Sequence, residues 1–230
     1  MICKKCGDEV VLEELKTPSA DALFAMSIIR MQEKFIERGT CDNCNKEESQ
    51  NSSNLSRLSQ WGKICPPLYR DTDVSRLDNS VVEKANSWIF SEKGFGLVGE
   101  SGKGKTRAIF HRLKREHLNG KSIHYQTGTG FALCLADPTK SRIEIDNCIY
   151  ADILFLDDLD KAKFTERVEA DLIHVIEERN KRLKPIIFAV NASGKELSEM
   201  FSDNRSEPIL RRLREFCEVH VFTAELKVVA

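Results

Sequence analysis

Short runs of apolar residues alternate along the chain with longer amphipathic stretches. Five runs have the length and composition of β-strands: 95–98, 121–126, 153–156, 186–190 and 219–222. Between them, stretches such as 106–118 and 166–183 place apolar residues at helical spacing. Strands that alternate with helices predict an α/β fold, with a parallel sheet between two layers of helices.

Three stretches interrupt this alternation. Residues 46–60 are rich in Ser, Asn and charged side chains and have no apolar periodicity, so we expect a polar linker there. The linker divides the chain into a small N-terminal module, 1–45, and a main domain, 61–230. Two prolines within 64–70 predict an extended lead-in to the main domain. The glycines and the proline in 127–150 predict an irregular segment.

A phosphate-binding loop follows the first buried strand and precedes an amphipathic helix. Its residues fit the pattern G-x-x-x-x-G-K-[ST]: Gly99, Glu100, Ser101, Gly102, Lys103, Gly104, Lys105 and Thr106. The glycines let the backbone wrap a phosphate group, and the amides of the loop and helix converge on the anion. Lys105 would place its charge at the β- and γ-phosphates, and the Thr106 hydroxyl would bind Mg²⁺. The sequence therefore predicts a nucleoside triphosphate site.

Polar residues end two of the buried strands. The run 153–156 leads into Asp157 and Asp158, and the run 186–190 leads into Asn191. We expect Asp157 to bind Mg²⁺, directly or through water, and Asp158 to orient and polarise the attacking water. Asn191 can hold that water or sense the γ-phosphate. The alternatives are an acidic helix N-cap at the aspartates and an ordinary turn at Asn191.

Four of the eight cysteines form two C-x-x-C pairs near the N-terminus: Cys3, Cys6, Cys41 and Cys44. Each pair places two thiolates on a tight turn, and together they supply the ligands of a closed tetrahedral Zn²⁺ site. No coordination position remains for a substrate, so we expect a structural metal. Apolar residues at helical spacing between Thr17 and Gly39 predict a helix that bridges the two pairs.

Composition limits the function classes that the chain can serve. Its 230 residues provide one sizeable domain and a small module. No stretch approaches the roughly 18 apolar residues of a membrane helix, and the first residues lack a signal-peptide core, so we expect a cytoplasmic protein. The formal net charge of -1 argues against a broadly basic coat for nucleic acid. Locally, Phe131, Lys140 and Arg142 combine an aromatic ring with cations, a candidate contact for single-stranded DNA, with ordinary core and surface roles as the alternative.

The order of these motifs resembles the core of AAA+ ATPases. The phosphate loop, the acidic strand end, the strand ending in Asn191 and a late arginine-rich helix follow one another as in those proteins. More narrowly, residues 64–70 and 169–180, and 191–193 preceded by Pro185, are similar to bacterial replicative-helicase loaders of the DnaC/DnaI group. The resemblance covers about residues 61–222. The cysteine module resembles this family only loosely, since some loaders carry a cysteine-rich N-terminal domain that contacts the helicase.

The resemblance implies an ATP-dependent loader of a replicative DNA helicase. ATP binding and hydrolysis would act as a switch on single-stranded DNA, the N-terminal module would bind the helicase, and the ATPase core would form a homo-oligomer. It assigns catalysis to Lys105, Asp158, Asn191 and Arg212, the last reaching into a neighbouring subunit's nucleotide site. Arg211 and Arg214 are rivals for that role, and a plain surface arginine is the alternative.

Two departures from the family pattern shape these expectations. Asp158 stands where many AAA+ proteins have Glu, which fits a slow, switch-like ATPase. Only eight residues follow Phe222, so we expect no full C-terminal helical lid and a nucleotide site completed by a neighbouring subunit. Two other functions remain open: an IstB-like transposition helper ATPase on double-stranded DNA, and a non-hydrolysing nucleotide-gated adaptor in which Asp158 is idle.

Overall fold

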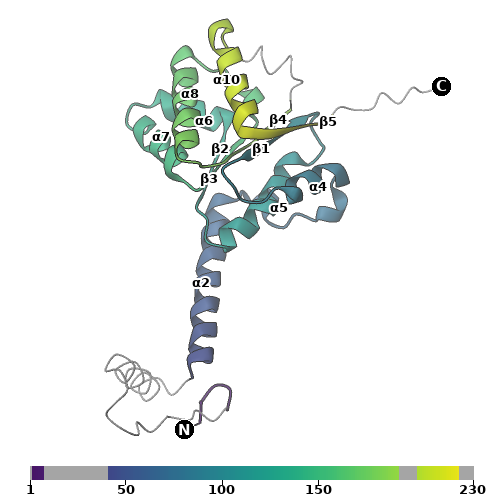
Figure 1. Ribbon diagram of the computed structural model, residues 1–230, viewed down its shortest axis with the longest axis vertical. Helices are drawn as coiled ribbons and strands as arrows, with labels where there is room; N and C mark the ends of the chain where they lie inside the picture. Colours follow the sequence, from purple (N-terminus) through teal and green to yellow (C-terminus); the bar gives the residue numbers. More distant parts are fainter. Residues whose placement is uncertain (1, 8–40, 192–200, 223–230) are drawn as a thin grey trace, which may run out of the picture. The chain divides into compact units, whose positions relative to one another are not determined.

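The computed structural model describes residues 2–7, 41–191 and 201–222 (Figure 1). The chain divides into two compact units, Met1–Ser56 and Arg57–Ala230. The helix expected between the two cysteine pairs lies outside the described residues. So do the residues after Phe222, where no full lid was expected.

Helix α2 (Asp42–Ile64) begins in the first unit and ends in the second. It includes residues 46–60, so the expected linker is helical, which the sequence pattern did not predict. These residues contain neither Gly nor Pro, and Glu, Gln, Lys, Arg and Leu are good helix formers. Apolar periodicity reveals only helices that bury one face, whereas the described side chains of this stretch are mostly exposed.

The larger unit is built on a five-stranded parallel sheet with the order β2-β3-β4-β1-β5. The strands are β1 (Gly94–Gly99), β2 (Ile123–Thr127), β3 (Ile153–Asp157), β4 (Ile186–Val190) and β5 (Cys217–Phe222). All five predicted strands are present. In the register, Val98 of β1 lies opposite Val190 of β4, and Asp157 of β3 lies opposite Thr127 of β2. The carboxyl ends of these strands therefore meet at one edge.

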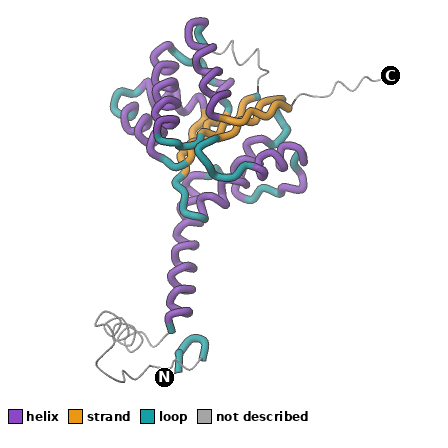
Figure 2. Tube along the Cα trace, viewed as in Figure 1, coloured by secondary structure: helices purple, strands orange, loops and turns teal. Residues whose placement is uncertain are grey.

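Helices cover both faces of the sheet, which confirms the predicted three-layer α/β architecture (Figures 1 and 2). One face carries α4 (Asn79–Ser87) and α5 (Lys105–Leu118). The other carries α6 (Gly128–Ala136), α7 (Ser141–Tyr150), α8 (Glu166–Lys181) and α10 (Asp203–Phe216). Shorter elements are α3 (Pro67–Arg70), η1 (Val74–Arg76) and η2 (Leu159–Lys161).

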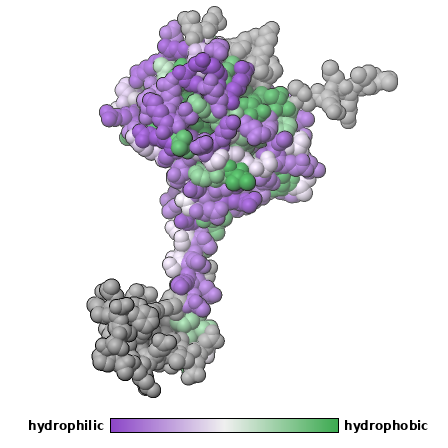
Figure 3. Space-filling view, viewed as in Figure 1, coloured by the Kyte–Doolittle hydropathy of each residue, from purple (hydrophilic) through white to green (hydrophobic). Residues whose placement is uncertain are grey.

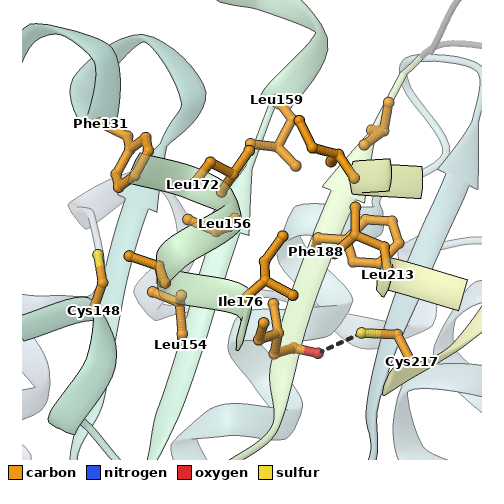
Figure 4. Close-up of a cluster of buried hydrophobic side chains, with 14 of the residues drawn as sticks. Phe131, Cys148, Leu154, Leu156, Leu159, Leu172, Ile176, Phe188, Leu213 and Cys217 are labelled. Atoms are coloured by element: carbon orange, nitrogen blue, oxygen red, sulfur yellow. Dashed lines mark hydrogen bonds between the residues drawn. The ribbon is translucent and has the colours of Figure 1, made fainter. Parts of the chain in front are cut away.

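The strands alternate between two cores. In β3, Leu154 and Leu156 face the core beneath α6, α7, α8 and α10 (Figure 4). Ile153 and Phe155 face the core beneath α4 and α5. A strand that is buried on both faces has apolar residues at consecutive positions. This is why the apolar run 153–156 predicted the strand.

The expectation of an irregular segment over 127–150 is wrong, because α6 and α7 lie there. The Thr127 side chain accepts a hydrogen bond from the Gly130 amide at 3.0 Å and caps the start of α6. Gly128 and Gly130 occupy the first turn of α6, and Pro138 lies between the two helices. The supposed breakers therefore mark helix ends.

The two prolines of the lead-in also mark a helix start. Pro66 is extended, with φ -55° and ψ 144°, and Pro67 is the first residue of α3. Proline suits this position because its missing N–H has no partner there in any helix. The predicted extended segment is thus correct at Pro66 and wrong at both ends, because Ile64 ends α2 and 67–70 form α3.

One face of the molecule shows how polar and apolar side chains are distributed on its surface. In Figure 3 the visible face carries hydrophilic residues over most of its described area, with small separate apolar areas. Among the described residues, every helix is too short or too polar to cross a lipid bilayer.

Candidate nucleotide-binding site

The loop between β1 and α5 has the backbone that a phosphate cradle requires. Gly102 and Gly104 have φ of +86° and +81°, values that side-chain-bearing residues rarely adopt. A Cβ at Gly104 would also lie 2.8 Å from Cδ2 of Leu77. No side chain caps the first turn of α5, so its free amides can meet an anion.

Lys105 points its ammonium into this loop. Nζ donates to the carbonyl oxygens of Gly99 at 2.8 Å and Glu100 at 2.7 Å, and to Oδ1 of Asn191 at 2.8 Å. The residue is 5% exposed, and burial lowers the pKa of Lys105 despite the nearby aspartates. The predicted phosphate-binding lysine and the predicted sensor residue are therefore in direct contact.

Thr106 and Asp157 form an oxygen pair suited to a hard divalent cation. Thr106 Oγ1 donates to Oδ1 of Asp157 at 2.9 Å. Burial, and then the charge of Asp158, raise the pKa of Asp157 to about 6. The charge of Lys161 acts in the opposite direction but does not outweigh these two effects. Mg²⁺ prefers oxygen ligands and would supply further positive charge, so the two residues fit the predicted magnesium site.

Asp158 follows β3 with its backbone in the left-handed region, at φ +50°. Both carboxylate oxygens accept hydrogen bonds: Oδ1 from Nδ2 of Asn191 at 2.7 Å, and Oδ2 from Nζ of Lys161 at 2.6 Å. The backbone amide of Asn191 donates to Oδ1 of Asp160 at 2.9 Å. Asn191 therefore links Lys105 to Asp158.

A cavity of about 570 Å³ opens over these residues. Besides the predicted residues, side chains that sequence reasoning missed line it: Tyr69, Asp71, Asp73, Arg76, Leu77, Arg107 and Lys161. Tyr69 stacks on Phe110 with ring centroids 5.2 Å apart, and the Arg107 guanidinium lies 5.5 Å from the Tyr69 ring centroid. Residues 71–77 carry no motif. The signals available for this wall were the position of Tyr69 in the stretch 64–70, which resembles the helicase loaders, and the position of Arg107 beside the phosphate loop.

The arginines proposed to act on a neighbouring subunit lie on α10. Arg212 forms an ion pair with Glu177 of α8, and its Nη1 donates to the Pro208 carbonyl at 3.4 Å. Arg211 lies 3.9 Å from Glu215, and Arg214 is exposed. None of the three lines the described cavity, so their role in trans stays a prediction.

The candidate DNA contacts on 127–150 are not alike. Phe131 is 0% exposed and packs in the core beneath α6 (Figure 4), so its ring is not available to a nucleic-acid base and that prediction is wrong. Lys140 is exposed and pairs with Asp137 at 3.2 Å, and Arg142 is exposed. Only the two cations can meet a ligand.

The structure brings the four predicted zinc ligands together in the smaller unit. Their sulfur atoms all lie within 4.8 Å of one another, with 3.9 Å between Cys3 and Cys44 and 3.8 Å between Cys6 and Cys41. Tetrahedral Zn²⁺ with Zn–S bonds of about 2.3 Å requires sulfur separations of about 3.8 Å. Hydrogen bonds from the Cys6 and Cys41 backbone lower the pKa of Cys3 to about 6, which favours the metal-binding thiolate. The cluster fits Zn²⁺.

Several solved structures share the fold of this chain. DnaI matches with a TM-score of 0.58 and 16% identity over 70% of this chain and 93% of its own. A putative primosome component from Streptococcus pyogenes serotype M3 matches with a TM-score of 0.53 and 22% identity, over 74% of this chain and 96% of its own.

AMPPCP-bound DnaA from Aquifex aeolicus matches with a TM-score of 0.53 and 20% identity. The match covers 70% of this chain and 51% of the DnaA chain, so this chain spans about half of that protein. No protein-family model and no curated protein sequence matches the chain. At these identities the likeness concerns the fold. The larger unit has the fold of an AAA+ P-loop domain.

Proposed function

We propose that this chain is an ATP-dependent loader of a replicative DNA helicase, in which ATP binding and hydrolysis act as a switch. One observation carries the proposal: Lys105, Thr106, Asp158 and Asn191 line one cavity at the carboxyl edge of the sheet, and the buried Asp157 accepts a hydrogen bond from Thr106 there. The fold is shared with DnaI and with AMPPCP-bound DnaA, which supports both the nucleotide and the replication role.

The contacts suggest how the residues would divide the work. Lys105 would exchange its loop carbonyls for the β- and γ-phosphate oxygens. Mg²⁺ held by Thr106 and Asp157 would neutralise charge that develops on the phosphates. Asp158 would orient the attacking water, and Asn191 would register whether the γ-phosphate is present, because it contacts both Lys105 and Asp158.

Single-stranded DNA has a better candidate site than the buried Phe131. A groove of about 310 Å³ lies between α6 and the segment 161–168. Lys161, Lys163 and Arg167 line it together with Thr129, Thr165 and apolar residues of α6. We propose that a strand binds here, with its phosphates at the cations. A DnaA of this fold has been solved with AMPPCP and single-stranded DNA, which supports a strand on this fold.

We also propose how the chain binds the helicase and a second copy of itself. The four-cysteine unit, folded around Zn²⁺, would bind the helicase, and the ATPase units would associate so that Arg212 reaches a neighbouring nucleotide. In that step Arg212 would exchange Glu177 for a phosphate oxygen. Such an exchange is plausible energetically because partly exposed ion pairs contribute only about 0–1 kcal/mol.

A non-hydrolysing adaptor is the second candidate, and one observation favours it. Both oxygens of Asp158 are already engaged, by Asn191 and Lys161. In this alternative Asp158 never receives the attacking water, and nucleotide binding alone controls the partner.

Steady-state ATP turnover by the full chain tests these proposals. It should be measured alone, with single-stranded DNA and with duplex DNA. Lys105→Ala provides the inactive variant, and Lys84→Ala, an exposed lysine on α4, provides the matched control. Turnover that single strands stimulate supports the loader. Stimulation mainly by duplex would favour the IstB-like helper, and nucleotide binding without turnover under any condition would favour the adaptor.

A further inference from the structure

Lys161 lies between the two described cavities and lines both of them. It ends η2, the short helix that follows Asp158, and its side chain is 58% exposed. Nζ donates to Oδ2 of Asp158 at 2.6 Å. One ammonium therefore faces the nucleotide cavity, the groove beside α6 and the carboxylate expected to activate water.

Each oxygen of Asp158 accepts one hydrogen bond and keeps a further lone pair that a water molecule can use. The ammonium of Lys161 at Oδ2 nevertheless opposes the arrival of a second positive charge there, the proton that Asp158 would take from the water. Oδ1 accepts a hydrogen bond from Asn191, which also contacts Lys105. This bond therefore connects Asp158 to the residues expected to sense the γ-phosphate. Oδ2 accepts only from Lys161 among the described contacts. Releasing Lys161 thus removes the cation from Oδ2 while the bond to Asn191 remains.

The groove offers the ammonium another anionic partner. Lys163 and Arg167 line it beside Lys161, and Leu133, which is 68% exposed, contributes an apolar wall. A single strand carries a phosphate at each nucleotide and bases that can lie against apolar side chains. The ion pair between Lys161 and Asp158 is an exposed i,i+3 pair, a kind that contributes little to stability. A phosphodiester in the groove can therefore compete for Lys161.

Helix α6, whose residues line one side of the groove, also packs against the backbone at Asp158. Gly128, the first residue of α6, is so close to the segment after β3 that a Cβ there would lie 2.9 Å from the Asp158 carbonyl oxygen. A ligand that contacts α6 therefore acts on an element packed directly against the backbone of Asp158.

We infer that Lys161 is a positioning residue that couples single-stranded DNA to ATP hydrolysis by releasing Asp158 when a phosphodiester binds in the groove. The inference rests on the proposed function and names the regulation of its site. With Oδ2 free, Asp158 accepts a proton from water as the water oxygen bonds to the γ-phosphorus. The bond from that phosphorus to the β-phosphate oxygen breaks, ADP carries away the electron pair, and Lys161 stays protonated throughout.

The test compares Lys161→Gln with Lys161→Arg in the full chain, using steady-state ATP turnover with and without an oligodeoxythymidylate. Without DNA, Lys161→Gln should raise kcat about three- to tenfold at unchanged KM, because its Asp158 is released as a proton acceptor. Added DNA should then change its rate little. Lys161→Arg keeps a cation and should keep a low basal rate and stimulation by DNA.

Lys181→Gln is the matched control, because Lys181 also forms an exposed i,i+3 pair, with Glu178 at 2.8 Å, away from both cavities. It should behave like the wild type. Lys163→Gln should require more DNA for half-maximal stimulation yet reach the same stimulated-to-basal ratio. That result would separate binding in the groove from coupling through Lys161.

Two outcomes overturn the inference and leave the proposed function standing. In the first, Lys161→Gln hydrolyses ATP and responds to DNA like the wild type. In the second, Lys161→Gln has a lower basal kcat, which would mean that Lys161 assists catalysis. A wild-type protein that never hydrolyses ATP overturns the proposed function, and the coupling fails with it. Turnover that single strands do not stimulate overturns the coupling and the DNA switch, but not the ATPase.

Discussion

The ammonium of Lys105 donates a hydrogen bond of 2.8 Å to the side-chain oxygen of Asn191, although 86 positions separate the two residues. The same amide donates to Asp158 through its nitrogen. Asn191 therefore joins the residue expected to bind phosphate to the residue expected to hold water. Through these contacts from Lys105 to Asn191 to Asp158, loss of the γ-phosphate would change the position of the carboxylate expected to orient water.

Replacing Asn191 with Ala should separate nucleotide binding from turnover. Lys105 and the loop remain, so the affinity for a fluorescent ATP analogue should change little, whereas kcat should fall about 10- to 100-fold. Asn180→Ala, on the exposed side of α8, is the control for a general effect of losing an amide. Equal losses in binding and turnover would argue against a sensing role.

Asp157 should make the nucleotide-free protein less stable as pH rises. The pKa of this buried carboxyl is raised to about 6 from an ordinary 3.8, so between these values the folded chain holds more protons than the unfolded chain. The free energy of unfolding then falls with rising pH, in total on the order of 3 kcal/mol. Asp157→Asn keeps an acceptor for Thr106 but cannot ionise. Its stability advantage over the wild type in urea unfolding should grow from pH 4 to pH 7.

Asp152 provides a control, because its effect on stability should change with pH in the opposite direction. At Asp152 partial burial is outweighed by hydrogen bonds from Ser122, which lower the pKa. Asp152→Asn should therefore fall further behind the wild type as pH rises through the acid range. A difference between wild type and Asp157→Asn that stays constant with pH would contradict the assignment of the raised pKa to Asp157.

Arg212 should be testable by mixing two inactive variants. Arg212→Ala alone should lower kcat about 100-fold or more if the guanidinium acts on a neighbouring nucleotide, and Lys105→Ala should be inactive because its own site is impaired. A mixture places an intact Arg212 beside an intact loop and should regain turnover. Arg211→Ala and Arg214→Ala, mixed in the same way, identify the arginine responsible. No recovery with any of the three would exclude Arg211, Arg212 and Arg214 as arginines supplied in trans.

The cysteine cluster should bind one Zn²⁺ per chain, and the metal should stabilise the smaller unit. Elemental analysis of purified Cys41→Ser should show loss of the metal, whereas Cys134→Ser, outside the cluster, should keep it. A strong chelator should change the far-ultraviolet circular dichroism of the wild type but not of Cys41→Ser. Equal zinc contents in the two variants would place the metal elsewhere.

The sequence predicted the parts of the site that depend on buried strands. Asp157 and Asn191 each end a fully apolar run, and parallel strands bring such ends to one edge, so their meeting followed from the pattern. Tyr69 and Lys161 reach the same cavity from segments without periodicity, where position depends on loop packing. Phe131 failed as a DNA contact because a sequence without a reliable helix assignment does not tell which way its ring points.

The left-handed backbone at Asp158 has an evolutionary consequence. Among residues with a Cβ, Asp, Asn and His tolerate this conformation best, and Glu is not among them. A change from Asp to Glu here would lengthen the acidic arm but place a less tolerant residue at φ +50°. Chains that share this turn are therefore expected to keep Asp at this position, unless the 158–161 segment changes its conformation at the same time.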